Sequence, residues 1–156
     1  MKSNKTKELT TVAILTAVSV VLGRAFLIPT PTGLLTLLDA GIYFTAFSIG
    51  GRQAGLVGAL SGFLIDLLSG YPQWMFFSLI AHGSQGFLAG TFEKNYRIIG
   101  LVCATLAMVG IYFISSLVLG YGMASSIAAV SGNIGQNFLG MIVGYILSLV
   151  FKVVKR

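Results

Sequence analysis

The hydrophobic pattern divides the chain into long apolar segments separated by short polar breaks. A helix that crosses the hydrocarbon core of a bilayer needs about 20 residues, and most of the segments approach that length. We therefore expect six helices, at Leu9–Leu27, Leu34–Ile49, Ala54–Leu68, Trp74–Phe92, Ile98–Leu119 and Ala124–Phe151.

The second and third segments are shorter than the others, and two arrangements fit them. A re-entrant hairpin would place Arg52 at membrane depth, which costs at least ~2.5 kcal/mol. Two short spanning helices avoid that cost, and we favour them.

The breaks between the segments consist of residues typical of turns. Proline removes a backbone donor and disfavours helix before it, so Pro29–Gly33 ends the first helix. The remaining breaks are Gly50–Gln53, Ser69–Gln73, Glu93–Arg97 and Gly120–Gly122.

Lys and Arg lie on alternate sides of the predicted helices. Of the ten basic residues, all but Arg24 fall near the termini or in the second and fourth breaks, as Lys2, Lys5, Lys7, Arg52, Lys94, Arg97, Lys152, Lys155 and Arg156. Because positively charged loops stay in the cytoplasm, both termini are predicted to be cytoplasmic. The formal net charge of +6 is then a topology signal, and we expect no nucleic-acid partner.

Composition supports a membrane location for the whole chain. Of its 156 residues, 56% are hydrophobic and 9% are charged. A soluble domain carries about 25% charged residues. The predicted fold is an all-α integral membrane protein, a compact bundle of six transmembrane helices in which residues 1–156 form one domain. That domain is too small to contain its own ATPase.

Two stripes of uncharged polar residues interrupt the apolar segments. Ser78, His82 and Gln85 share one face of the fourth helix. Asn133, Gln136 and Asn137 share one face of the sixth. At 1.5 Å per residue, His82 lies ~12 Å and Asn133 ~13 Å from the outer helix ends, so the stripes are at matching depth.

The matched stripes predict a pocket for a small polar ligand in the outer half of the membrane. Trp74, Tyr71 and Tyr43 would supply flat stacking surfaces. The alternative is that the stripes only hydrogen-bond helices to one another, at ~0.6 kcal/mol per bond on average. Trp74 is also interpretable as an interfacial anchor.

Three charged residues fall toward the outer ends of the first three helices. Arg24, Asp39 and Asp66 are predicted to form a mutual ion pair that locks the bundle, and direct contact with a ligand is the alternative. Charges at membrane depth usually pair with one another or face a cavity.

Enzyme functions are poorly supported, and we expect no catalytic residues. His82 is the sole histidine, and Asp66 could orient it toward a serine only across helices. One His and one Cys cannot build a typical zinc site, so no metal or other cofactor is expected.

The first helix carries a patch of small residues near its cytoplasmic end. Ala13 and Ala17 lie on one face, with Thr10 one turn below. Small residues at this spacing allow close approach of helices. The patch is either internal packing or a docking site for a partner in the membrane.

These features together resemble the substrate-binding S components of energy-coupling factor (ECF) vitamin transporters. The specific part is Leu37–Gly90, "LLDAGIYFTAFSIGGRQAGLVGALSGFLIDLLSGYPQWMFFSLIAHGSQGFLAG". It is similar to the S-component group around riboflavin and hydroxymethylpyrimidine uptake. There an Asp opens helix two, a Gly-rich turn follows, and an Asp-Leu-xx-Gly-Tyr-Pro stretch leads into helix four.

The resemblance implies a vitamin pocket near the outer face, walled by helices four to six. Pro29–Gly33 would form a lid and Tyr71–Trp74 a second covering loop. Ala13 and Ala17 would contact a membrane-embedded T component, which joins two cytoplasmic ATPases. The location implied is the bacterial cell membrane, as a multi-pass protein in contact with the lipid bilayer.

The ligand is expected to be small and largely neutral, because no charged side chain lies deep in helices four to six. This favours hydroxymethylpyrimidine or pyridoxine over thiamine or biotin. Riboflavin and pantothenate stay open as alternatives, as do a stand-alone permease and a structural membrane subunit.

Overall fold

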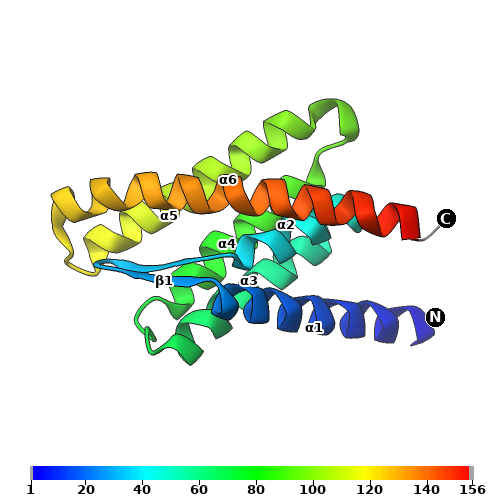
Figure 1. Cartoon of the computed structure of the whole chain (residues 1–156), viewed down its shortest axis with the longest axis horizontal. Coiled ribbons are helices and arrows are strands. Elements are labelled where there is room, and N and C mark those ends of the chain that lie inside the picture. Colours follow the sequence, from blue (N-terminus) through cyan, green and yellow to red (C-terminus); the bar gives the residue numbers. More distant parts are fainter. Residues whose placement is uncertain (1, 155–156) are drawn as a thin grey trace.

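The computed structural model describes residues 2–154, which fold into a helical bundle with one β-hairpin (Figure 1). The elements in chain order are α1 (Lys2–Ala25), β1 (Leu27–Thr30), β2 (Gly33–Thr36), α2 (Leu38–Ser48), α3 (Gly51–Ser69), α4 (Met75–Thr91), the 3-10 turn η1 (Lys94–Tyr96), α5 (Arg97–Val118) and α6 (Gly122–Val154).

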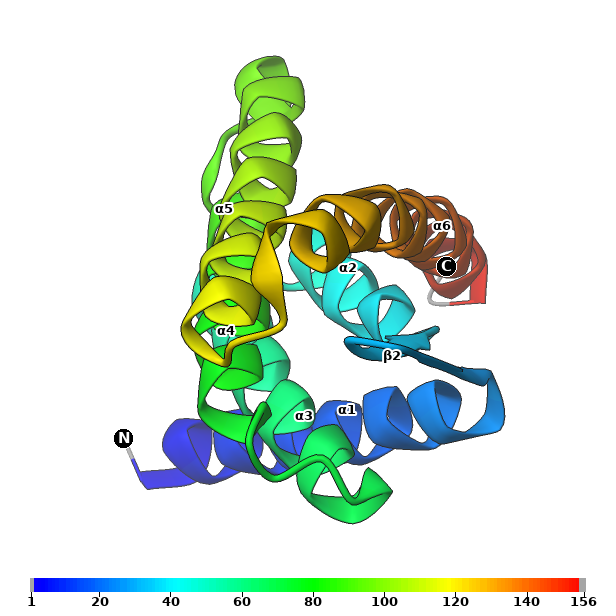
Figure 2. The ribbon, with the colours of Figure 1, turned by 90° about the vertical axis from the view of Figure 1, so that its left-hand side faces the viewer.

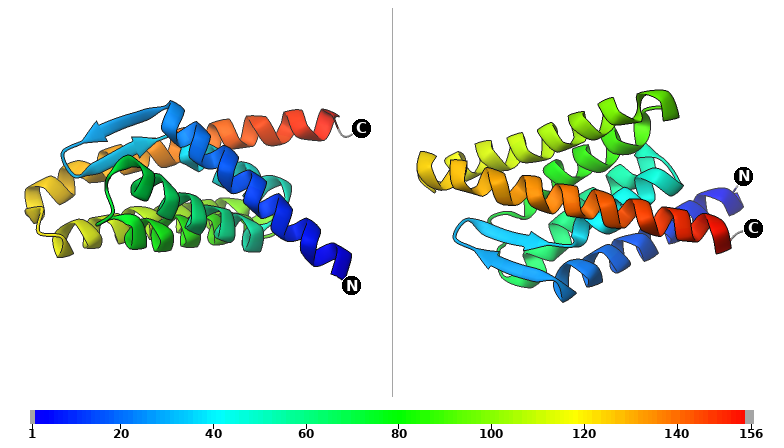
Figure 3. Two further views of the ribbon diagram at one scale, coloured as in Figure 1. Left: turned by 90° about the horizontal axis from the view of Figure 1, so that it is seen from below. Right: turned by 45° about the horizontal axis from the view of Figure 1, so that its top comes forward.

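The helices run back and forth between two ends of the molecule. Both ends of the chain lie at one end of the bundle, together with the α2–α3 and α4–α5 connections (Figures 1 and 3). The hairpin turn and the α3–α4 and α5–α6 connections lie at the opposite end. Arg52 and Arg97 are therefore at the same end as the two termini.

The short helix α2 forms the centre of the bundle. Every residue of α2 is buried except Phe44 and Ser48, which are half-buried. Figure 2 looks onto the hairpin end, where α2 lies between α6, α4 and the α1–α3 pair. At 1.5 Å per residue, α2 is only about 16 Å long, well short of a bilayer core. The hairpin leads into α2 and lengthens this crossing (Figure 1).

Glycines bring α3 and α4 into backbone contact. A Cβ atom on Gly58 would overlap the carbonyl oxygen of His82, and one on Gly86 would overlap that of Ala54. On α6, a Cβ on Gly144 would lie 2.7 Å from the Ala40 carbonyl oxygen of α2. Small residues at such crossings let helices pack closely where lipid provides no hydrophobic force between them.

The prediction of an all-α fold is wrong at the hairpin. Helix α1 ends at Ala25 rather than Leu27, and α2 begins at Leu38 rather than Leu34. Strands β1 and β2 pair antiparallel, with Leu27 opposite Thr36 and Thr30 opposite Gly33. The prolines at 29 and 31 prevent a helix here, and the Thr30 hydroxyl accepts the Gly33 amide at 3.1 Å.

The outer surface is apolar and the interior carries polar groups. Large apolar side chains such as Ile98, Leu106 and Val118 are exposed, whereas Asp39 and Gln85 are fully buried. Three helical stretches in the described chain are long and apolar enough to cross a membrane, Lys5–Ala25, Arg97–Val118 and Gly122–Lys152. The membrane character of the chain is thus evident, and the six-span count stays a prediction.

Candidate ligand-binding site

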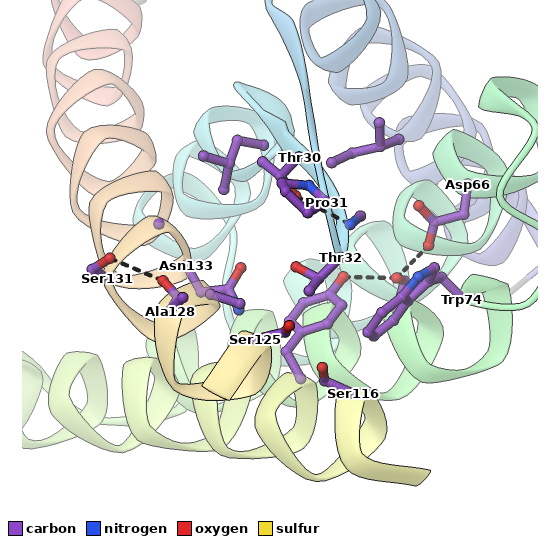
Figure 4. Close-up of a pocket in the computed structure, with 17 residues that line it drawn as sticks. Thr30, Pro31, Thr32, Asp66, Trp74, Ser116, Ser125, Ala128, Ser131 and Asn133 are labelled. Atoms are coloured by element: carbon purple, nitrogen blue, oxygen red, sulfur yellow. Dashed lines mark hydrogen bonds between the residues drawn. The ribbon is translucent and has the colours of Figure 1, made fainter. Parts of the chain in front are cut away.

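A cavity of about 350 Å³ opens near the hairpin end of the bundle (Figure 4). Residues 30–35 of the hairpin cover one side, and residues 125–133 near the start of α6 form another. The remaining wall comes from Asp66, Trp74, Ser78, Tyr112 and Ser116. Ligand pockets are usually ~300–1,000 Å³, so this cavity suits a small molecule.

Trp74 supplies an aromatic wall on the α4 side of the cavity. Trp74 is only 5% exposed, and its ring stacks on Tyr121, with centroids 5.7 Å apart and planes 22° apart. The Tyr112 ring also packs against the indole, with ring centroids 5.8 Å apart. The indole Nε1 is buried without a hydrogen-bond partner in the described part of the chain. A ligand acceptor would complete it, because a buried donor left unpaired costs about 1–3 kcal/mol.

Asn133 faces Trp74 across the cavity from α6 (Figure 4). Its amide takes part in none of the hydrogen bonds among the described residues. A free amide offers a donor and an acceptor side by side. It is therefore suited to the edge of a flat heterocycle.

A polar network begins at the cavity and continues beneath it. The Ser78 hydroxyl donates to Asp66 and lies 2.7 Å from the Tyr112 hydroxyl, which lies 3.0 Å from His82 Nε2. His82 Nδ1 is 3.2 Å from an Asp39 carboxylate oxygen. Of the predicted α4 stripe, only Ser78 reaches the cavity, and His82 lies directly behind it.

The other predicted ligand contacts bond to protein groups outside the cavity lining. Gln85 Oε1 lies 2.8 Å from His82 Nδ1. Gln136 accepts the Thr36 amide at 2.8 Å and approaches Asp39 at 3.4 Å. The remaining members, Tyr43 and Asn137, bond to each other at 2.6 Å. None of these residues lines the cavity, and neither does Tyr71, which is half-buried in the α3–α4 loop.

The predicted ion pair among Arg24, Asp39 and Asp66 does not form. Arg24 donates instead to the Ser69 hydroxyl at 3.0 Å. Asp39 is held by His82 in the core, and Asp66 accepts from Ser78 at the cavity. The expectation of a common outer level was wrong because α2 starts four residues late and places Asp39 deep in the bundle.

The resemblance placed helix five in the pocket wall and Pro29–Gly33 over it as a lid, and both contribute to the cavity lining, but the sequence prediction named no residue of α5. Tyr112 and Ser116 are four residues apart on α5, a spacing that signals one polar face in an apolar segment. Thr30 and Thr32 enter the site only because the hairpin folds back over it. The sequence predicted a lid at Pro29–Gly33 but not the strand pairing that builds it.

The small-residue patch of α1 is on the outside of the bundle. Ala13 and Ala17 are exposed, while Val12 and Thr16 face the core. Within the described residues, the patch therefore does not serve internal packing.

Comparison with known proteins places these features in a family. The model of the "ECF-type riboflavin transporter, S component" family matches residues 3–153, which is nearly the whole chain. The chain belongs to this family of S components. The predicted family resemblance, the membrane location and the absence of an enzyme function are thereby confirmed.

Individual relatives agree with this assignment. The S component is 43% identical over 151 residues to the "Thiamine precursor transporter HmpT" of Lactococcus lactis subsp. cremoris (strain MG1363), covering 95% of this chain and 89% of the relative. It is 32% identical over 130 residues to an "Uncharacterized protein in gap 3'region" of Pyrococcus woesei, covering 80% and 86%.

A solved structure shares the fold of this S component. It is described as "Structure and mechanism of the S component of a bacterial ECF transporter". The TM-score is 0.62 at 26% sequence identity, and the match covers 97% of this chain and 95% of the other.

Proposed function

We propose that this S component binds hydroxymethylpyrimidine, the pyrimidine half of thiamine, at the outer face of the cell membrane. It would do so as the substrate-binding subunit of an ECF-type importer. A membrane-embedded T component and two cytoplasmic ATPases complete that importer and supply its energy. The proposal includes six spanning segments with cytoplasmic termini, and it is supported by the basic residues, which gather at the end of the bundle opposite the cavity.

The observation that carries the ligand assignment is that Asn133 and Trp74 line opposite walls of one small cavity. The ligand has one flat ring, and an exocyclic amine lies next to a ring nitrogen. An amide can donate to that nitrogen and accept from the amine, as Asn does with the adenine edge. The indole provides the stacking face, and the nearby Asp66 carboxylate accepts N–H donors.

Size and chemistry weigh against the alternatives. Riboflavin is favoured by the family description, but its three fused rings and ribityl chain need more room than about 350 Å³ comfortably offers. Pyridoxine fits by size, but it has no exocyclic amine beside a ring nitrogen to pair with the Asn133 amide. The 43% identical relative carries the name of a thiamine precursor transporter, which supports the pyrimidine.

Calorimetric titration of the purified chain in detergent tests the proposal. We expect the wild type to bind hydroxymethylpyrimidine more tightly than pyridoxine, riboflavin or thiamine. Asn133→Ala should weaken that binding roughly 5- to 150-fold, since a buried polar group left unpaired costs about 1–3 kcal/mol. Asn95→Ala, at the opposite end of the bundle, is the matched control and should bind as the wild type does.

Two results would count against the proposal in different ways. Unchanged affinity in Asn133→Ala would remove that residue from the site. A folded wild type that binds another vitamin but not hydroxymethylpyrimidine would overturn the ligand assignment.

A further inference from the structure

One unbroken chain of hydrogen bonds connects the cavity with the centre of the bundle. It starts at the Asp66 carboxyl group on α3, which is hydrogen-bonded to the Ser78 hydroxyl of α4. Ser78 is 2.7 Å from the Tyr112 hydroxyl of α5, and Tyr112 is 3.0 Å from His82 Nε2. The chain ends at Asp39 of α2, 3.2 Å from His82 Nδ1. Four helices thus contribute to one relay with a carboxylate at each end.

Counting protons along the relay leaves two possible directions. Ser78 and Tyr112 have one hydroxyl proton each, and three contacts must share the protons available. In the first direction, His82 Nε2–H donates to Tyr112, Tyr112 to Ser78, and Ser78 to an ionised Asp66. In the reverse direction, a protonated Asp66 donates to Ser78 and a bare Nε2 accepts from Tyr112. Any other pattern leaves either one close contact without a proton or one hydroxyl proton without an acceptor.

The surroundings of the imidazole favour the first direction. His82 Nδ1 faces two acceptors, Asp39 Oδ1 at 3.2 Å and Gln85 Oε1 at 2.8 Å. It must therefore donate, and a ring that also donates through Nε2 is a cation beside the Asp39 carboxylate. Asp39 is fully buried, and its other polar neighbour, Gln136, is 3.4 Å away. A buried carboxylate needs a charged partner, which the cationic ring provides.

The relay carries a net negative charge in either direction. Two carboxylates and one imidazole share a single extra proton, which leaves a net charge of −1. No Lys or Arg forms an ion pair with Asp39 or Asp66 in the described part of the chain. Tyr112 and Tyr43, the tyrosines that face this region, add no positive charge. In the first direction the excess negative charge resides on Asp66, at the cavity wall.

We propose that Asp39 and His82 act as positioning residues that hold Asp66 as an acceptor-only carboxylate at the cavity. This relay makes the site selective for ligands that present an exocyclic N–H donor or a cationic nitrogen to Asp66, such as an aminopyrimidine, over the analogue with an oxo group at that position. The selectivity part rests on the proposed function. The direction of the relay does not depend on the identity of the ligand.

The direction is measurable in the wild type because His82 is the sole histidine of the chain. Nitrogen-15 NMR of protein labelled only at histidine reports the protonation of each ring nitrogen separately. We expect a protonated Nε2 at neutral pH in the protein without ligand. A bare Nε2 would overturn the proposal, because the relay would then run from Asp66 toward His82.

The selectivity is tested with hydroxymethylpyrimidine and its analogue in which an oxo group replaces the exocyclic amine. Tyr112→Phe breaks the relay and keeps the ring beside Trp74. We expect the wild-type preference for the amine to fall at least about tenfold, since a buried carboxylate without its relay tends to neutralise. Tyr121→Phe is the control, because Tyr121 also stacks on Trp74 but lies outside the relay. The preference of Tyr121→Phe for the amine over the oxo analogue should match that of the wild type.

The outcomes separate the relay from the ligand assignment. A preference that is unchanged in Tyr112→Phe overturns the relay even if hydroxymethylpyrimidine binds well. A wild type that binds neither compound contradicts the ligand assignment, and the histidine spectrum still decides the direction of the relay. If Tyr112→Phe is less stable but keeps the wild-type ratio of amine to oxo affinity, the relay has a purely structural role.

Discussion

The hydroxyl of Tyr43 on α2 donates a 2.6 Å hydrogen bond to Oδ1 of Asn137 on α6. Both residues are fully buried, and the Thr105 hydroxyl of α5 donates to the same oxygen at 3.0 Å. One amide oxygen thus joins three helices below the cavity. These two residues were expected at the ligand, and their contacts instead favour the alternative of interhelical bonding.

Tyr43→Phe should therefore weaken the bundle and leave the site intact. Removing one interhelical hydrogen bond is expected to cost about 0.6–1 kcal/mol of unfolding free energy, and ligand affinity should change less than about twofold. Thermal unfolding in detergent and calorimetric titration measure the two effects. Tyr145→Phe, on the half-exposed surface of α6, is the control. A large loss of affinity at unchanged stability would place Tyr43 at the ligand.

Close contact between α3 and α4 positions Asp66 against Ser78. Gly58→Ala should force the two backbones apart, because the new Cβ would overlap the His82 carbonyl oxygen. Overpacking of this kind typically costs about 1–3 kcal/mol, and we expect ligand affinity to fall with stability. Gly110→Ala on α5 meets no atom within 4 Å and should be neutral in both measurements. Equal behaviour of the two variants would argue against backbone contact.

The exposed patch of α1 is expected to bind the T component. Ala13→Trp should abolish uptake by the assembled transporter and leave ligand binding to the isolated chain unchanged, because a bulky side chain blocks close helix approach. Val18→Trp, exposed on another face of α1, should transport normally. If Ala13→Trp assembles and transports as the wild type does, the T component docks elsewhere.

The orientation in the membrane is open to cysteine labelling. Cys103 is the sole native cysteine and is replaced by serine in the background. With cytoplasmic termini, an impermeant thiol reagent added outside cells should label Gln73→Cys and should not label Glu93→Cys. The opposite pattern would invert the proposed topology.

The apolar pattern predicted most of the helical architecture because membrane helices are long and their breaks are marked. The turns at Gly50, at Gly70 and after Leu119 fall where Gly and charge predicted them. The hairpin was missed because Leu34 and Leu35 suit a helix and a strand equally. Their pairing with Ile28 and Pro29 is a contact across the turn that hydrophobicity does not reveal.

The site was predicted in part for a similar reason. The spacing of Ser78 and His82 correctly predicted one buried polar face on α4, because helical periodicity is local. Which polar face meets a cavity depends on how helices cross. The positions of Asp39 beside His82 and of Tyr112 between Ser78 and His82 follow from glycine contacts between helices, which one sequence does not specify.

The most direct test of the account uses Trp74, the sole tryptophan of the chain. Its fluorescence reports one wall of the cavity, because the indole is buried there between Tyr112 and Tyr121. Titrating the purified wild type with hydroxymethylpyrimidine should give a saturable change in emission, with the same affinity that calorimetry measures. Calorimetric binding of hydroxymethylpyrimidine with no change in Trp74 emission would contradict this cavity as the site, and no binding by either method would contradict the ligand.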